Sequence, residues 1–246
     1  MKPLLSLFLA LAAVCCQASV AIGFNTPATM YGLMGWWPCN QGSGTNIIDR
    51  SGLTNDGHFV AVNHTFSQSP LWTNGILSYC LILRAASVQD YIVCTNAGKM
   101  LTNDFTVAFW AYPLHDSASS PIYVCDGTAS VNGWNVQCAG SYKVQGYTSQ
   151  SGVNQITLTG NNAAPQNKWV HLCFVRHTTT MTIYTNGVNA TVTPASHLDP
   201  TAPTGEFRIG DYYSVAAFYF GGLNDVRIYN RVLTTNEIGH LYTQFQ

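Results

Sequence analysis

The carboxylates that could carry out hydrolysis are few and scattered in this sequence. A retaining sugar hydrolase on a β-sandwich needs two carboxylates about 5–5.5 Å apart, commonly two residues apart on one strand face. The chain has two glutamates, Glu206 and Glu237, and neither has another acidic residue two positions away. H-E-x-x-H and G-x-S-x-G motifs are also missing from the sequence. Unless distant aspartates converge, we therefore do not expect an enzyme.

Aromatic side chains in turns offer a binding chemistry instead. Trp134 lies between Asn132 and Asn135 in a segment containing glycine, and Tyr212 and Tyr213 follow an aspartate. Exposed aromatic faces stack on the C–H groups of sugar rings while amides bind the hydroxyls, so we predict ligand binding at Trp134, Tyr212 and Tyr213. The alternative is that these rings pack at the ends of the fold. Four other tryptophans fall inside strand patterns and are assigned to the core: Trp36, Trp37, Trp110 and Trp169.

One loop carries oxygen ligands that suit a hard cation. Asp49, Asn55 and Asp56 lie within eight residues of one another, together with two glycines. Calcium takes six to eight oxygen ligands from carboxylates, amide carbonyls and the backbone. Asx side chains equally bind their own turns, so a purely local role for this loop is the alternative.

The overall charge excludes one large class of partner. Charged residues make up 9% of the 246 residues, with ten Lys and Arg against eleven Asp and Glu. Soluble domains usually contain about 25% charged residues. A formal net charge of −1 provides no cationic field for phosphate chains, so we expect no nucleic-acid binding. Hydrophobic residues reach 47%, which is sufficient to form a core and argues against disorder.

The first 21 residues have the pattern of a secretory signal peptide. Lys2 precedes the apolar run Leu4–Val14, and cleavage after Ala18 or Ala21 fits the small residues that follow. A membrane anchor is the alternative, but a spanning helix needs about 20 residues. No later stretch is long and apolar enough to cross a membrane. We expect a protein that is secreted, periplasmic or at the cell surface.

The cysteines allow two interpretations. Cleavage would remove Cys15–Cys16, where lipid attachment is an alternative form of processing. Six cysteines in an oxidising compartment permit 15 disulfide pairings, of which Cys80 with Cys94 and Cys125 with Cys138 are the most local. Buried free thiols are equally consistent with their apolar neighbours. The six are Cys39, Cys80, Cys94, Cys125, Cys138 and Cys173.

The elements that must position these residues are strands. In 105–112 the odd-numbered residues form one apolar face and the even-numbered residues form a second, as expected of a strand between two layers. The segment 169–175 behaves in the same way. Asn186-Gly187 after 181–185 predicts a type I′ hairpin. Further strands are expected at 33–38, 76–83, 90–94, 121–125, 134–138, 155–159, 206–210, 217–221 and 223–229.

Only the C-terminus has helical chemistry. Thr234 and Glu237 fit a capping box, with apolar residues following at helical spacing, so a helix of one or two turns should begin there. No linker or repeat interrupts residues 30–246, which we take as one domain. Its fold class is all-β, a two-sheet antiparallel sandwich or jelly roll with a short C-terminal helix.

The order of several motifs resembles the laminin-G-like, concanavalin A-like family of jelly-roll domains. Any one of these motifs is weak, but their succession across about 210 residues is specific. The resemblance implies a concanavalin A-like jelly roll that acts as a lectin-like recognition module. The motifs are GWWPCNQGSG at 35–44, DRSGLTNDG at 49–57, QDYI at 89–92, FTVAFW at 105–110, WVHL at 169–172, YTNGV at 184–188 and GLNDVRIYNRVLT at 222–234.

The same resemblance extends the cation hypothesis. It implies that Asp225 lies near the 49–56 loop, which gives a structural calcium site formed by Asp49, Asn55 and Asp225. The alternative is that Asp225 pairs with an arginine such as Arg227 or Arg231.

Together these observations predict an exported, non-catalytic module that binds a glycan or a surface protein through its loops or a sheet face. A structural or adhesive surface component is the main alternative. A carbohydrate-active enzyme with an unfamiliar site is the third.

Overall fold

The computed structural model describes residues 28–62, 70–84, 89–94, 103–116, 120–127, 131–203, 206–212 and 217–245. The chain divides into two compact units, Met1–Tyr31 and Gly32–Gln246. Within the described part of the first unit, one 3-10 turn, η1, covers Ala28–Met30. The predicted signal peptide, residues 1–21, lies outside the described residues and stays a prediction.

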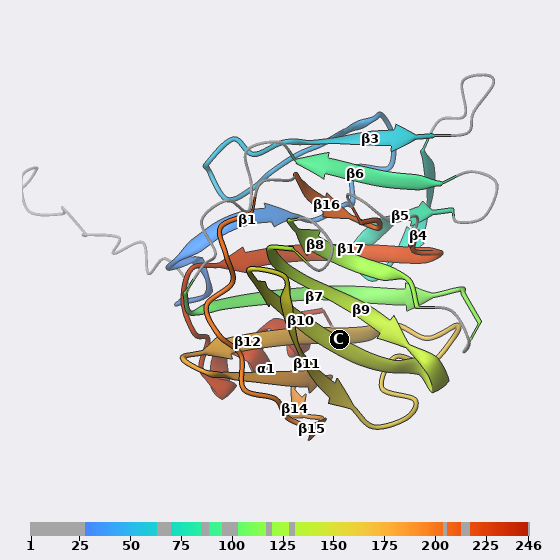
Figure 1. Cartoon of the computed structure of the whole chain (residues 1–246). Coiled ribbons are helices and arrows are strands. Elements are labelled where there is room, and N and C mark those ends of the chain that lie inside the picture. The colour runs from blue at the N-terminus through green and yellow to red at the C-terminus, as the bar shows by residue number, and fades with distance from the viewer. Residues whose placement is uncertain are drawn as a thin grey trace, which may run out of the picture. The chain divides into compact units, whose positions relative to one another are not determined.

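The second unit is a sandwich of two antiparallel sheets. Among the described residues, sheet A has eight strands and sheet B has nine. In Figure 1, β9, β10 and β11 of sheet B pass in front of β7 and β12 of sheet A. The order in sheet A is β14 (Val188–Asn189), β13 (Thr180–Thr185), β12 (Val170–His177), β7 (Phe105–Pro113), β17 (Gly221–Tyr229), β5 (Ser78–Leu83) and β4 (Leu71–Gly75), with β1 (Leu33–Trp37) also paired to β17.

Sheet B is the second layer of the sandwich. Its strands are antiparallel throughout, as are those of sheet A. The two-sheet sandwich expected from the alternation is therefore confirmed. The order in sheet B is β15 (Thr191–Thr193), β11 (Val153–Thr159), β10 (Lys143–Gln150), β9 (Gly133–Ala139), β8 (Ile122–Asp126), β16 (Phe207–Ile209), β6 (Asp90–Cys94), β3 (Gly57–Ala61) and β2 (Asn46–Ile47), with the 3-10 turn η2 (Gly140–Tyr142) between β9 and β10.

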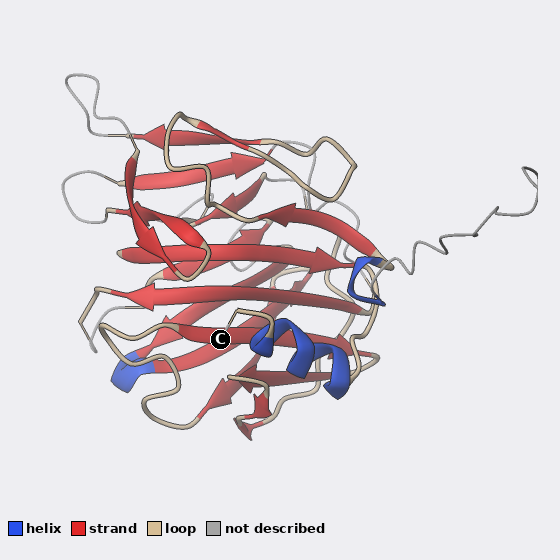
Figure 2. Ribbon diagram, turned by 180° about the vertical axis from the view of Figure 1, so that it is seen from behind, coloured by secondary structure: helices blue, strands red, loops and turns tan. Residues whose placement is uncertain are grey.

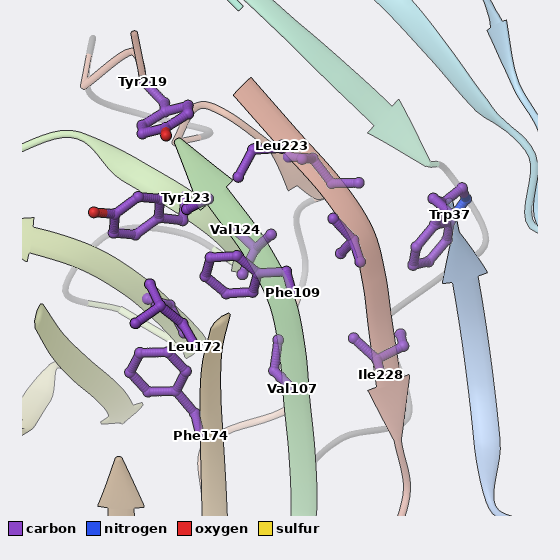
Figure 3. Close-up of a cluster of buried hydrophobic side chains, with 14 of the residues drawn as sticks. Trp37, Val107, Phe109, Tyr123, Val124, Leu172, Phe174, Tyr219, Leu223 and Ile228 are labelled. Carbon is purple, nitrogen blue, oxygen red and sulfur yellow. The ribbon is translucent and has the colours of Figure 1, made fainter. Parts of the chain in front are cut away.

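The core lies between the sheets, where alternate side chains of each strand meet (Figure 3). Phe109 of β7 lies 5.5 Å from Tyr123 and 6.2 Å from Phe174, measured between ring centroids. Val107 and Ala111 share its face, as the alternation of this segment predicted. Aromatic pairs at these separations add to the stabilisation gained by burying the rings.

Two local predictions are confirmed. Asn186 and Gly187 have φ of 50° and 78° and join β13 to β14, which is the positive-φ pair that a type I′ turn requires. The helix α1 spans Thr235–Thr243 and is longer than the one or two turns expected. Thr234 and Glu237 form the complete capping box. Figure 2 shows α1 on the outer face of sheet A.

One predicted strand needs correction, and five strands of the described residues were not predicted: β2, β3, β4, β10 and β15. Residues 217–220 form no strand, and Gly221 begins the single long strand β17. Strand β10 was not predicted because its inward positions include Gly146 and Thr148, which give no apolar alternation. The bare Gly146 position makes room for core side chains, since a Cβ there would clash with Met181 Sδ and lie 3.2 Å from the Phe174 ring.

The cysteines of the described residues are all buried free thiols. The two local disulfides are not formed. Cys80 and Cys94 belong to different sheets, while Cys125 stands opposite Asn135 rather than Cys138. Burial raises the pKa of the Cys80 and Cys138 thiols to about 11, so both are protonated at neutral pH.

No helix in the described part of the chain has the length and apolar character needed to cross a membrane.

Candidate functional site

A shallow cavity of about 230 Å³ lies on the outer face of sheet B. Its walls combine two phenol rings, three side-chain amides and one aliphatic side chain. None of the lining residues is charged. They are Asn135, Gln137, Tyr147, Asn154, Ile156 and Tyr212.

The floor of the cavity is set by strand register. Tyr147 of β10 stands opposite Asn135 of β9 on one side and Ile156 of β11 on the other. Because side chains alternate along a strand, these three point outward while Trp134 and Val136 point into the core. A row of amide, phenol and aliphatic groups therefore crosses three neighbouring strands.

Hydrogen bonds hold the two phenols in place. The Asn135 amide Nδ2 donates to the Tyr212 hydroxyl at 3.2 Å, and the Gln145 Nε2 donates to the Tyr147 hydroxyl at 3.0 Å. Burial raises the pKa of Tyr147, so its phenol is neutral at physiological pH. The Asn135 side-chain carbonyl is buried and has no hydrogen-bond partner among the described residues. A ligand hydroxyl that donates a hydrogen bond to this oxygen would satisfy a buried acceptor.

An ion pair fixes the segment that carries Tyr212. Arg208 of β16 lies 3.0 Å from Asp211 and 3.1 Å from Glu206. Its guanidinium also covers the Tyr91 ring at 4.5 Å. Asp211 is further tied through its backbone carbonyl, which accepts a hydrogen bond from the Cys125 thiol. The position of Tyr212 beside the cavity is thus defined by buried contacts on the residue before it.

The three aromatic residues predicted to bind a ligand have different positions in the structure. Tyr212 lines the cavity, although its side chain is only 8% exposed. The prediction for Trp134 needs correction. This residue is 2% exposed and packs in the core against Phe105 and Phe207, so its ring cannot stack on a sugar. Tyr213 lies outside the described residues.

Two of the tryptophans assigned to the core are also corrected. Trp37 is fully buried between the sheets, but Trp36 and Trp169 are partly exposed on the outer side of sheet A. Trp110 is buried outside the sandwich, where its ring stacks on Tyr242 of α1. Alternation identified these strands correctly but could not assign which face each tryptophan occupies.

The predicted calcium ligands are already occupied by protein donors. Asp49 Oδ1 accepts hydrogen bonds from the backbone N–H groups of Trp36 at 2.9 Å and Ser51 at 2.8 Å. Its Oδ2 accepts from the Ser51 hydroxyl at 2.7 Å and from the Asn55 N–H at 2.9 Å. These four bonds use the acceptor sites of the carboxylate, as an Asx turn does.

Asp225 is held in the same way. Its Oδ1 accepts from the Trp36 indole N–H at 2.7 Å and lies 2.9 Å from the Arg227 guanidinium. Arg227 also covers the Trp36 ring at 4.5 Å. Burial raises the pKa of Asp225, while the charge of Arg227 and the hydrogen bond from Trp36 oppose that shift. The cation already beside this carboxylate is an arginine.

Asp49 and Asp225 would therefore have to exchange these protein donors for a calcium ion. Within the ranges that the structure describes, no group of three or more His, Cys, Asp or Glu residues is placed to hold a metal. The calcium site predicted from the sequence is untested, and these contacts favour its alternative, in which Asp49 binds its own turn and Asp225 pairs with Arg227. We expect millimolar calcium chloride to leave the Tm unchanged in a calorimetric scan. A rise in Tm that disappears in Asp49→Asn would contradict this expectation.

Sequence reasoning missed most of the cavity. Gln137, Tyr147, Asn154 and Ile156 were not singled out, and Asn135 was noted only as a neighbour of Trp134. A usable signal existed in 133–139, where polar Asn135 and Gln137 alternate with apolar residues. No comparable signal marked Tyr147, because the strand that carries it was not recognised.

Comparison with known proteins agrees with this fold. Residues 86–239 match the family described as the concanavalin A-like lectin/glucanases superfamily. A search of curated protein sequences gave no match. Among solved structures, domain 4 of AbnA, an extracellular GH43 arabinanase from Geobacillus stearothermophilus in complex with arabinotriose, is 14% identical with a TM-score of 0.63. The similarity covers 86% of this chain and 98% of that domain.

Toxin binding domains share the fold as well. The binding domain of Paraclostridial Mosquitocidal Protein 1 is 16% identical with a TM-score of 0.67, covering 88% of this chain and 53% of that one. The binding domain of botulinum neurotoxin DC in complex with SialylT is 12% identical with a TM-score of 0.63, covering 88% and 52%. This chain spans about half the length of these toxin domains. Identities this low show the fold alone.

The family match extends over more than half of the chain, and the two-sheet sandwich is the architecture that it implies. The chain therefore belongs to the laminin G type of the concanavalin A-like lectin/glucanases superfamily.

Proposed function

We propose that this chain is an exported, non-catalytic recognition module that binds a neutral oligosaccharide at the cavity on sheet B. The observation that carries the proposal is the row of Asn135, Tyr147 and Ile156, completed by Tyr212 at its side. Aromatic rings contact the C–H faces of sugars, and amides exchange hydrogen bonds with their hydroxyls. A cavity of about 230 Å³ suits a small part of a glycan chain rather than a protein surface.

The electrostatics of the cavity favour an uncharged glycan. Among the residues that the structure describes, no lysine or arginine lines it, and the nearby Arg208 is already paired with Asp211 and Glu206. A sialylated glycan would bring a carboxylate with no cation to bind it. Arabinotriose is neutral, and it is the ligand in the similar arabinanase domain. We therefore choose arabinotriose as the test ligand.

The two glutamates support a non-catalytic role. Glu206 pairs with Arg208, whereas Glu237 caps α1 and lies 2.6 Å from Arg231. Hydrogen bonds from Arg231 lower the pKa of Glu237 to about 2, so it cannot deliver a proton as a general acid at neutral pH. We expect no release of reducing ends when the protein is incubated with arabinan.

Export is also part of the proposal. It rests on the signal-peptide pattern of residues 1–21, which predicts a secreted, periplasmic or cell-surface protein. The similar arabinanase domain comes from an extracellular enzyme. N-terminal sequencing of the mature protein tests the export step: a start after Ala18 or Ala21 supports it, and retention of Met1 contradicts it.

Tyr147→Ala is expected to weaken the binding of arabinotriose at the sheet B cavity at least tenfold, which corresponds to about 1.4 kcal/mol. The substitution removes the central ring of the floor and the acceptor of the Gln145 hydrogen bond. Tyr147→Phe keeps the ring and should lose less affinity for arabinotriose than Tyr147→Ala. Isothermal titration calorimetry measures both.

The matched control is Tyr79→Ala. Tyr79 is 45% exposed and lines neither the cavity on sheet B nor any surface used in the proposal. It should bind like the wild type. Equal affinities for wild type and Tyr147→Ala at this site, in a variant with an unchanged Tm, would refute the assignment of the cavity.

A further inference from the structure

A second cavity, of about 290 Å³, lies on the outer face of sheet A. It uses strands on the opposite side of the sandwich from the first cavity. We call it the sheet A groove. Its lining combines two aromatic rings, one aliphatic side chain, one thiol and two polar residues of β4: Thr73, Asn74, Cys80, Ile82, Tyr112 and Trp169.

A glycine creates the depth of the sheet A groove. Gly222 of β17 stands between Ile82 of β5 and Tyr112 of β7, so the middle position of this row has no side chain. A Cβ at Gly222 would lie 3.2 Å from the Trp169 ring and 3.3 Å from both Cys80 Sγ and Ile82 Cδ1. The side chains around Gly222 thus converge over bare backbone.

The walls of the groove suit one kind of ligand. The Trp169 and Tyr112 rings lie 5.4 Å apart at an angle of 49° and form an aromatic wall. Thr73, on the edge strand β4, places a hydroxyl beside it, and the backbone carbonyl of Asn74 accepts a hydrogen bond from the Cys80 thiol at 3.6 Å. The Cys80 thiol is neutral, with its pKa raised to about 11 by burial. Within the described part of the chain, no charged residue lines the groove.

We infer that the sheet A groove is a second binding site for a neutral sugar unit, so that one chain holds two glycan segments on its opposite outer faces. The choice of ligand class rests on the proposed function of the first cavity, whereas the groove itself rests on Gly222, Tyr112 and Trp169. Apolar ring faces beside a hydroxyl and a backbone carbonyl match the two-sided chemistry of a sugar ring.

The placement of the two sites has a physical consequence. Packed sheets lie about 10 Å apart, and the two sites face away from each other, so a trisaccharide cannot reach both. A single chain would therefore bridge two glycan strands. Because the sites face opposite ways, the chain should cross-link separate glycan strands or particles, whereas a single flat glycan surface should engage only one site at a time.

Calorimetry with arabinotriose tests the stoichiometry, and latex beads coated with arabinan test the bridging. The wild type should bind two molecules per chain and agglutinate the beads. Trp169→Ala and Gly222→Ala should each bind one molecule and fail to agglutinate, although they still attach to beads. Gly222 does not have positive φ, so alanine there fills the floor of the groove without backbone strain.

Variants at the sheet B cavity distinguish the proposed function from the proposed second site. Tyr147→Ala should also bind one molecule and fail to agglutinate, and the double variant with Trp169→Ala should bind none. Tyr79→Ala should behave as the wild type. One site per wild-type chain, lost in Tyr147→Ala and unaffected by Trp169→Ala and Gly222→Ala, would overturn the second site and leave the first.

The opposite pattern, with binding lost only in Trp169→Ala, would overturn the proposed function of the sheet B cavity and keep the groove. Absence of binding by a wild type with an intact thermal transition would overturn both.

Discussion

Trp134→Ala is expected to lower the free energy of unfolding by about 3–5 kcal/mol, as measured by urea denaturation. Trp134 is 2% exposed, and its ring centroid lies 5.4 Å from that of Phe105 and 6.1 Å from that of Phe207. Removing the indole opens a cavity between the two sheets, where neighbours on rigid strands can collapse only partly. This loss is a large share of the 5–15 kcal/mol that stabilises a typical domain.

A milder change at the same position separates packing from polar interactions. The indole Nε1 of Trp134 is buried, and none of the residues that the structure describes accepts a hydrogen bond from it. Trp134→Phe therefore loses volume but no hydrogen bond, and we expect it to lose less than half as much stability as Trp134→Ala. If Trp134→Ala instead unfolded at the wild-type urea midpoint and lost glycan binding, the ring would be a ligand contact after all.

The second large effect is a fall in stability between pH 6.5 and about pH 4, caused by two buried histidines. His197 is fully buried, and its ring nitrogens each lie 2.8 Å from a hydroxyl, that of Thr148 on β10 or that of Thr157 on β11. Burial, reinforced by the charge of Arg176, lowers the pKa of His197 to about 4. Burial and Arg227 lower the pKa of His171 to about 3.

The sign follows from proton linkage. Between pH 6.5 and 4 the unfolded chain protonates these histidines and the folded chain does not, so the unfolded state binds more protons and stability falls as the pH falls. His197 alone contributes a loss of about 3 kcal/mol by pH 4, since one pKa unit is worth 1.36 kcal/mol. Above pH 6.5 both states are neutral at these positions, and this contribution disappears.

Urea denaturation across this pH range measures the slope. His197→Gln keeps groups that can bond Thr148 and Thr157 but removes the titration, so its slope should be shallower than that of the wild type. Glu237 acts separately, because its pKa is lowered to about 2 and its contribution is lost only as the pH falls through about 4.5 to 2. A slope between pH 6.5 and 4 that His197→Gln leaves unchanged would contradict the assignment.

Several features of the fold were fixed by interactions between residues close in sequence. The Asn186-Gly187 turn requires only two residues that tolerate positive φ, and both adopt it. The capping box joins Thr234 to Glu237 across three positions. The alternation in 105–112 places Phe105 and Phe109 on one face of β7 whatever the partner strand. Such patterns were readable because their causes lie within a few residues.

The candidate sites depended on distant strands. Asn135 and Tyr147 meet because β9 and β10 pair in one register, and a shift of one residue would send both side chains inward. Gly222 forms a groove only because Ile82 and Tyr112, each more than 100 residues away in the chain, flank it. Trp134 was misassigned because alternation gives two faces without saying which of them is buried.

The sequence by itself thus determined the all-β class, the strand-rich organisation, the hairpin, the helix cap and the family. Only the tertiary structure decided that Asp225 pairs with Arg227, that the six cysteines are free thiols, and which aromatic rings face solvent. The physical reason is that propensity and patterning act locally, whereas a binding surface is formed by strand register and sheet stacking between residues far apart in the chain.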